Sequence, residues 1–345
     1  MHEKYQDIVE FVKQKRSCSS TEVFEAFSGK YSHATVKRAL QLLIAQNHLN
    51  KTGSAKNTRY VLSPSWQLIY PVNLHEYYQK DIDERIINKT FNFQLIKNLL
   101  PHAEIFNDAE NERLEKNQRK FINNINKLTQ AEYDKEMERL AIDLSWKSSQ
   151  IEGNTYSLLE TEQLIKEKKT AAGKTREEAT MLLNHKEAID FILENPDYLY
   201  PLSLTNIENL HSILIKELAV SKNIRTKKVG ISGTNYSPLD NEYQIKEAMN
   251  DMCKLVNNKK NVFEKALLAL LLISYIQPFM DGNKRTARIV CNAVLLHHKC
   301  CPLSFRTVDS IDYKKAILLF YEINNLSAFK LLFMEQYEFA VNTYF

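Results

Sequence analysis

The sequence predicts a mainly α-helical protein with a small amount of β-structure. Only seven glycines occur in 345 residues. Apolar residues recur at three- and four-residue spacing through most of the chain, which is typical of amphipathic helices. Two stretches, 49–62 and 225–238, instead combine strand-like alternation with turn residues. The length is sufficient for two or three domains.

Residues 1–63 are expected to form a first domain of three helices followed by a hairpin. Apolar residues mark each helix, and Ser19 and Ser32 precede the second and third helices as N-cap candidates. Two strand-like runs, 49–52 and 58–62, are separated by a polar turn. This order of elements resembles a winged helix-turn-helix domain.

The basic charge of the chain is concentrated in this first domain. Residues 1–63 hold ten Lys or Arg and five Asp or Glu, a net charge of +5, against +4 for the whole chain. In a winged helix the third helix enters the major groove and the hairpin contacts the DNA backbone. The DNA-binding candidates are Thr35, Lys37, Arg38, Lys56 and Arg59. The alternative is a protein-binding module, because winged helices serve both purposes and fold alone does not fix function.

The rest of the chain is expected to contain a helical linker region, 64–134, and a helical domain, 135–345. Ser63-Pro64-Ser65 separates the linker from the first domain. In the last domain, 262–276 and 283–297 are expected to be helices, and 225–238 is expected to be a hairpin.

A short loop between the two expected helices, residues 277–282, has the composition of a polyphosphate site. A helix N-terminus offers free backbone N–H groups and a favourable dipole for anions. Gly282 lets the backbone approach a phosphate closely, and Asp281 is the type of ligand that Mg²⁺ prefers. Arg285 and Arg288 share one helix face and can bind phosphate oxygens, and Lys284 adds a cation.

Residues 277–288 read Gln-Pro-Phe-Met-Asp-Gly-Asn-Lys-Arg-Thr-Ala-Arg. This run resembles the signature of the Fic (Fido) family, His-Pro-Phe-x-Asp/Glu-Gly-Asn-Gly/Lys-Arg-x-x-Arg. The resemblance implies a Fic-type helical bundle that binds ATP and Mg²⁺ and transfers AMP to a hydroxyl of a target protein. It implies metal binding by Asp281, and a catalytic and nucleotide-binding set formed by Asp281, Gly282, Asn283, Lys284, Arg285 and Arg288.

One position departs from this signature. Gln277 stands where the family has its catalytic histidine, the general base that acts on the incoming hydroxyl. A glutamine amide does not take up a proton near neutral pH, and loss of a positioned base costs about 10²- to 10⁴-fold in rate. Three functions therefore stay open. The chain is an adenylyltransferase slowed by Gln277, or a catalytically inactive ATP-sensing regulator that acts through the winged-helix domain, or an enzyme that transfers a different phosphate-containing group, as some relatives of the family do.

A second motif lies upstream, where residues 148–154 read Ser-Ser-Gln-Ile-Glu-Gly-Asn. Through Ser148, Glu152 and Gly153 it resembles the inhibitory motif of the same family, Ser/Thr-x-x-x-Glu-Gly/Asn. The resemblance implies that Glu152 pairs with Arg288 and so keeps ATP from binding productively. The alternative is a simple helix end, with Gly153 as its left-handed cap.

The expected hairpin 225–238 resembles the flap of the family, which pairs with an extended segment of the target by strand addition. Lys228, Val229 and Ile231 are the candidates for that edge, and an ordinary surface hairpin is the alternative. His185 and His211 have no partner spacing that indicates a metal site, and we expect both to be core or capping residues.

The remaining expectations concern location and assembly. The five cysteines include no Cys-x-x-Cys pair, which fits a reducing cytoplasm. The N-terminal residues lack the pattern of a secretory signal, and no apolar run approaches the roughly 18 residues of a membrane span. The expected partners are ATP, a target protein and DNA, and a homo-oligomer is left open.

Overall fold

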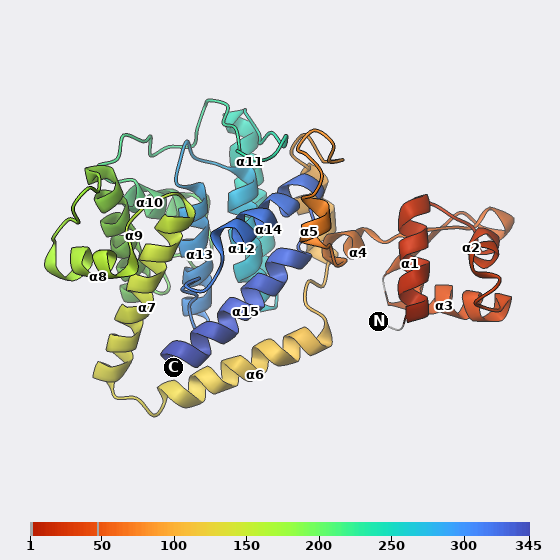
Figure 1. The fold of residues 1–345 in the computed structure, drawn as a ribbon, viewed down its shortest axis with the longest axis horizontal. Coiled ribbons are helices and arrows are strands. Elements are labelled where there is room, and N and C mark those ends of the chain that lie inside the picture. Colours follow the sequence, from red (N-terminus) through yellow and green to blue (C-terminus); the bar gives the residue numbers. More distant parts are fainter. Residues whose placement is uncertain (1–2, 47) are drawn as a thin grey trace. The chain divides into compact units, whose positions relative to one another are not determined.

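The computed structural model describes residues 3–46 and 48–345, and the chain divides into two compact units (Figure 1). The first unit is Met1–Pro71 with His102–Glu104, and the second is Val72–Pro101 with Ile105–Phe345. The first unit therefore extends past residue 63, where the sequence predicted its end. Most of the expected linker, 64–134, belongs to the second unit.

The first unit has the predicted order of three helices and a hairpin. Its elements are α1 (Glu3–Lys15), α2 (Ser20–Phe27), α3 (His33–Ala45), β1 (Leu49–Thr52), β2 (Arg59–Leu62) and α4 (Pro64–Ile69). Ser19 caps α2 in a capping box with Glu22, and Ser32 caps α3. The two strands are antiparallel, with Leu49 opposite Leu62.

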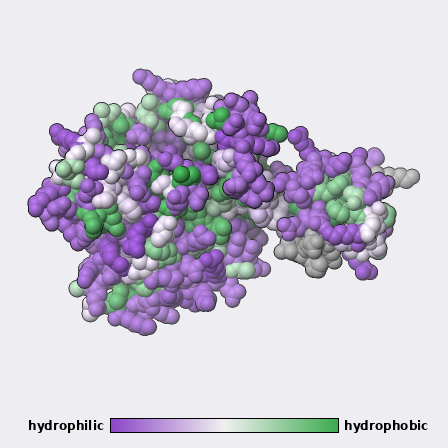
Figure 2. All heavy atoms as spheres, in the orientation of Figure 1, coloured by the Kyte–Doolittle hydropathy of each residue, from purple (hydrophilic) through white to green (hydrophobic). Residues whose placement is uncertain are grey.

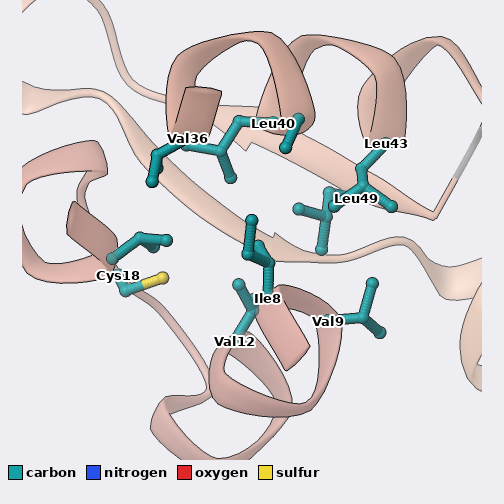
Figure 3. Packing of buried hydrophobic residues seen from close by; sticks show 10 residues of the cluster. Ile8, Val9, Val12, Cys18, Val36, Leu40, Leu43 and Leu49 are labelled. Atoms are coloured by element: carbon teal, nitrogen blue, oxygen red, sulfur yellow. The ribbon is translucent and has the colours of Figure 1, made fainter. Parts of the chain in front are cut away.

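The core of the first unit lies between α1, α3 and the start of the hairpin. Figure 3 shows Ile8 and Val12 of α1 facing Val36 and Leu40 of α3, with Cys18 beside them. All five side chains are buried. This separate core is the reason why residues before Pro71 form a compact unit of their own.

The second unit is helical. Its helices are α5 (Leu74–Tyr77), α6 (Asp108–Ile125), α7 (Gln130–Ile151), α8 (Leu158–Glu167), α9 (Arg176–Glu194), α10 (Leu204–Leu214), α11 (Glu242–Asn258), α12 (Val262–Ile276), α13 (Asn283–His297), α14 (Ser310–Ile323) and α15 (Ser327–Tyr344). Capping boxes at Asn107, Thr129, Ser157 and Thr175 start α6, α7, α8 and α9. The predicted bounds of α12 and α13 agree with the structure.

The centre of the second unit is the antiparallel pair α12 and α13 (Figure 1). Every residue of α12 from Phe263 to Ile276 is buried, as expected for a helix that is apolar on all sides. α13 is buried through most of its length although it carries Arg285 and Arg288, and α7, α9 and α10 pack around it. Two arginines are thus placed inside the bundle, where each needs a partner.

Part of the expected linker contributes to this core, which is why it is not a separate region. Leu95, Leu100 and Phe106 are buried, and the backbone N–H of Ile105 donates to the Glu264 carboxylate of α12 at 2.8 Å.

Figure 2 shows apolar residues scattered among hydrophilic ones on the visible face. No helix in the described ranges is long and apolar enough to cross a membrane.

The hairpin predicted at 225–238 is not formed. Within the described residues, the β-type pairing of this segment is limited to an isolated parallel bridge between Ser237 and Thr90, and the backbone N–H of Arg225 donates to the Pro278 carbonyl at 3.0 Å. Arg225, at its start, donates to the carbonyls of Gln277 (2.6 Å), Lys227 (2.9 Å) and Leu239. The segment is therefore anchored at its ends by a side chain rather than by a second strand.

Candidate anion-binding site

The loop that joins α12 to α13 is shaped by two residues in the left-handed conformation. Gln277 ends α12 with φ 52°, and Gly282 precedes α13 with φ 79°. A Cβ at Gly282 would lie 3.1 Å from Cε1 of His211, so a side chain here would be crowded as well as strained. Gly282 also gives α13 no side-chain cap, which leaves the first N–H groups of the helix available to a ligand.

Gln277 and Asn283 brace this loop from inside. Nε2 of Gln277 donates to the Ser274 carbonyl at 2.7 Å, and Oε1 accepts from Nδ2 of Asn283 at 3.0 Å. Asn283 also bonds to both the N–H and the carbonyl of Phe279, each at 2.8 Å. Both side chains are buried. The amide of Asn283, which the family resemblance assigns to the anion site, is used within the loop itself.

Arg285 and Arg288 bring buried positive charge to the same helix turn. Their exposed fractions are 1% and 0%. Nη2 of Arg285 contacts Oδ2 of Asp281 at 3.1 Å, and Nη2 of Arg288 contacts Oε1 of Glu152 at 2.9 Å. The Nη1 atoms of both arginines are buried and have no hydrogen-bond partner among the described residues. Since a guanidinium can only donate, these atoms call for an acceptor such as a phosphate oxygen.

Glu152 stands at the end of α7 and makes the predicted contact with Arg288. Its second oxygen, Oε2, lies 3.2 Å from Nζ of Lys284, so two cations hold one carboxylate. Burial raises the pKa of Glu152, but the charges of Arg288 and Lys284 lower it by more, and the net pKa lies below the usual value. Gly153 follows with φ 101°, which turns the chain away from the helix.

Ser148, one turn before Glu152, also binds Arg288. Its hydroxyl accepts from Nε of Arg288 at 2.8 Å, and its carbonyl accepts from Nη2 at 2.9 Å. The predicted residues Ser148, Glu152 and Arg288 therefore meet at one point, where α7 contacts α13.

Asp281 fits a Mg²⁺ ion that is bound together with phosphate. Its side chain is 65% exposed and lies beside the helix N-terminus. No group of three or more His, Cys, Asp or Glu residues that could hold a metal occurs in the described part of the chain. Mg²⁺ commonly binds through one or two carboxylates plus substrate phosphates, so a single carboxylate here suits that mode and not a protein cage.

His211 of α10 supports the loop by packing against Phe279, which belongs to the loop. Their rings are stacked, with centroids 3.6 Å apart and an interplanar angle of 4°. Burial, followed by the charge of Arg285, lowers the pKa of His211 to about 3, so the imidazole is neutral. Its Nδ1 lies 3.1 Å from Oγ1 of Thr286, which itself donates to the Gly282 carbonyl. The expectation of a core histidine agrees with this placement.

The remaining candidates are more exposed. In the flap segment Lys228 is exposed, whereas Val229 and Ile231 are half-buried. In the first unit Lys37 and Arg38 project from α3 and Thr35 is half-buried. Arg59 of the hairpin is paired with Glu22 at 2.5 Å. The side chain of Lys56 lies outside the described part of the structure.

Three contacts of the site were not identified from the sequence. Arg225 ties the flap segment to the Gln277 carbonyl, Lys284 pairs with Glu152 as well as lying beside the anion site, and His185 contacts Ser148. Each contact joins residues more than 35 positions apart, and no local spacing signals such a pair.

Residues 201–295 match the Fic/DOC family model. The protein adenylyltransferase Fic of Nematostella vectensis is 30% identical over 175 residues, which cover 48% of this chain and 40% of that protein. The protein adenylyltransferase fic-1 of Caenorhabditis elegans is 24% identical over 172 residues, covering 47% and 33%. The chain thus matches less than half the length of these relatives.

Solved structures show the same fold. Fic-1 from C. elegans superposes with a TM-score of 0.60 at 20% identity, over 68% of this chain and 72% of that one. A Fic domain containing signalling protein from Bacteroides thetaiotaomicron superposes with a TM-score of 0.58 at 17% identity, over 67% of this chain and 94% of that one.

Proposed function

We propose that the second unit, whose residues 201–295 match the Fic/DOC family model, binds ATP with Mg²⁺ and transfers AMP to a protein hydroxyl. We further propose that Glu152 restrains this activity and that Gln277 keeps it low. The named activity of the relatives, protein adenylyl transfer, supports the reaction class.

One observation carries the proposal: the unpartnered Nη1 atoms of Arg285 and Arg288, both buried at the start of α13. A buried cationic donor without an acceptor is costly. Two of them beside an uncapped helix N-terminus suit a ligand with several anionic oxygens. A polyphosphate offers anionic oxygens to both arginines at once, whereas a nucleoside carries no anionic acceptor.

Different residues of the site would bind different parts of the nucleotide and its metal ion. The Gly282 turn and the first N–H groups of α13 would receive phosphate oxygens, and Arg285 would neutralise their charge. Asp281 would hold Mg²⁺, which supplies further charge neutralisation at the phosphates. Arg288 would bind the terminal phosphate only after Glu152 has released it, because Nη2 of Arg288 faces that carboxylate.

Gln277 is unsuited to act as a base. An amide oxygen is not protonated near neutral pH, and both Nε2 and Oε1 already bond to Ser274 and Asn283. Transfer by the native chain therefore depends on positioning and charge stabilisation without a base, and we expect a rate about 10²- to 10⁴-fold below that of a chain with histidine here.

The second candidate function is a catalytically inactive, ATP-sensing regulator that acts through the first unit. The bracing role of Gln277 favours it, since this side chain contributes to the shape of the loop without any chemistry. On α3, Lys37 and Arg38 are exposed and form no ion pair within residues 3–46 and 48–345, which favours DNA as the partner of that unit.

Calorimetric titration of the whole chain tests the nucleotide site common to both functions. We expect ATP with Mg²⁺ to bind more tightly than adenosine, and Arg285→Met to weaken ATP binding at least about tenfold, the effect of one charge-assisted hydrogen bond. Arg113→Met, which removes an exposed partner of Glu338, is the matched control. Equal affinities for ATP and adenosine in the wild type would overturn the proposal.

A further inference from the structure

His185 joins the contact between α7 and α13 from a third helix, α9. Its Nε2 lies 2.6 Å from Oγ of Ser148, and that oxygen lies 2.8 Å from Nε of Arg288. Arg288 in turn contacts Glu152 at 2.9 Å. His185, Ser148 and Arg288 each have an exposed fraction of 0%. Four polar side chains from three helices thus form one chain of hydrogen bonds, and water does not reach its first three members.

The direction of these bonds follows from the chemistry of the groups. A guanidinium only donates, so Oγ of Ser148 must accept from Arg288. In the described part of the chain the Ser148 hydroxyl has no other acceptor, so we assign its proton to the bond with Nε2 of His185. The neutral imidazole then carries its proton on Nδ1, which is buried and has no hydrogen-bond partner among the described residues. Burial, and then the charges of Arg288 and Arg285, hold the pKa of His185 well below its usual value, which agrees with the neutral form.

Without an acceptor at position 185, the Ser148 hydroxyl would donate its hydrogen bond to a different group. A serine inside a helix readily donates to the carbonyl four residues earlier, here that of Leu144. That rotation would turn the Oγ lone pairs away from Nε of Arg288. α7 would then hold Arg288 through Nη2 alone, by the Ser148 carbonyl and Glu152.

We infer that His185 is a positioning residue for the restraint that Glu152 places on Arg288. By accepting a hydrogen bond from the Ser148 hydroxyl, His185 keeps Arg288 directed at Glu152 and away from the nucleotide. This inference rests on the proposed function, because it concerns the same arginine and the same phosphate. It adds a third helix, α9, to the contact that restrains Arg288, so that α9 acts on ATP affinity through Ser148.

The test is ATP titration of the full chain carrying changes at positions 185 and 148. His185→Leu removes the acceptor, and we expect ATP to bind about three- to tenfold more tightly, the effect of one net hydrogen bond. His185→Gln keeps an acceptor oxygen at similar reach, and its affinity should stay within about twofold of wild type. His297→Leu, which changes a histidine paired with Asp197, is the matched control.

A double-mutant cycle separates positioning from general loosening of the core. Ser148→Ala alone should tighten ATP binding as His185→Leu does, and adding His185→Leu to Ser148→Ala should change it no further. Additive effects, or unchanged affinity in both single variants, would overturn the inference. If His185→Leu does not fold, the ATP affinities of Ser148→Ala and His185→Gln are compared instead. Tighter binding by Ser148→Ala with wild-type affinity in His185→Gln supports the inference, and unchanged affinity in Ser148→Ala contradicts it.

Glu152→Gln distinguishes failure of this inference from failure of the restraint itself. If Glu152→Gln tightens ATP binding while His185→Leu and Ser148→Ala do not, Glu152 restrains the site and His185 has no part in it. If none of the three variants tightens ATP binding, the proposed restraint is wrong together with the inference.

Discussion

Replacing Glu152 by glutamine removes the charge that competes with a terminal phosphate for Arg288. The carboxylate makes two charge-assisted contacts, 2.9 Å to Arg288 and 3.2 Å to Lys284. The glutamine has nearly the same shape and retains a carbonyl oxygen at the same place, so packing at the end of α7 is conserved. The substitution therefore tests the charge and not the volume of the side chain.

The magnitude follows from the contacts that ATP must break. Each charge-assisted hydrogen bond contributes about 1.5–3 kcal/mol. Most of this free energy is recovered when phosphate replaces the carboxylate on Arg288. The displaced Glu152, whose side chain is already 19% exposed, also regains some hydration. The expected net gain in ATP binding free energy is therefore that of one such contact. Since about 1.4 kcal/mol corresponds to a factor of ten in affinity, the Kd for ATP should fall about 10- to 100-fold.

Isothermal titration with ATP and Mg²⁺ measures this change directly. Glu160→Gln is the matched control, because Glu160 closes the capping box of α8 and does not contact Arg288 or Lys284. Both variants should show the unfolding temperature of a folded chain before they are titrated. If wild type binds ATP and Glu152→Gln binds it with a Kd within twofold of wild type, Glu152 does not compete with phosphate and the reasoning fails.

Three further predictions address the loop, the start of α9 and the first unit. Gly282→Ala should lower the free energy of unfolding by about 1–3 kcal/mol in urea denaturation, because it combines positive φ with contact to His211, whereas Gly29→Ala, with open space around it, should change little. Bonds from Thr155 and Thr175 lower the pKa of Glu178 from 4.5 to about 2, so its contribution to stability is present above about pH 4.5 and is lost as the pH falls toward 2. The stability difference between wild type and Glu178→Gln should therefore shrink below pH 4.5, and a constant difference would contradict the assignment. Lys37→Glu with Arg38→Glu should weaken DNA binding in a gel-shift assay of the whole chain, and wild-type affinity should fall with salt; affinity that is flat with salt would argue for a protein partner.

The parts of the fold that follow from local pattern were predictable from the sequence. α12 is apolar on all sides between the Asn261 cap and Gln277, and α13 starts where Gly282 breaks the chain. The three helices and hairpin of the first unit carry their caps and turn residues within a few positions of each element. Such signals are local, and so the bounds of these elements could be read from the chain.

The parts that depend on distant partners were not predictable in the same way. Strand-like alternation at Val229–Ile231 covers too few residues to specify a hairpin, and a strand needs a partner that the sequence does not name. The family motif placed Glu152 next to Arg288, but nothing local indicates that Lys284 shares the carboxylate or that His185 reaches Ser148. Packing of α7, α9 and α13 brings these residues together, and the sequence spacing does not encode it.

AMP transfer from ATP labelled on the α-phosphate tests the central claim most directly, that this site binds ATP but is held back by Gln277 and Glu152. The protein itself can serve as the acceptor, and Gln277→Ala with Glu152→Gly is the matched control for Gln277→His with Glu152→Gly. We expect wild type and the control to label little, and the histidine variant to label about 10²- to 10⁴-fold faster than the control. Labelling of wild type as strong as that of the histidine variant would show that Gln277 and Glu152 do not limit the reaction.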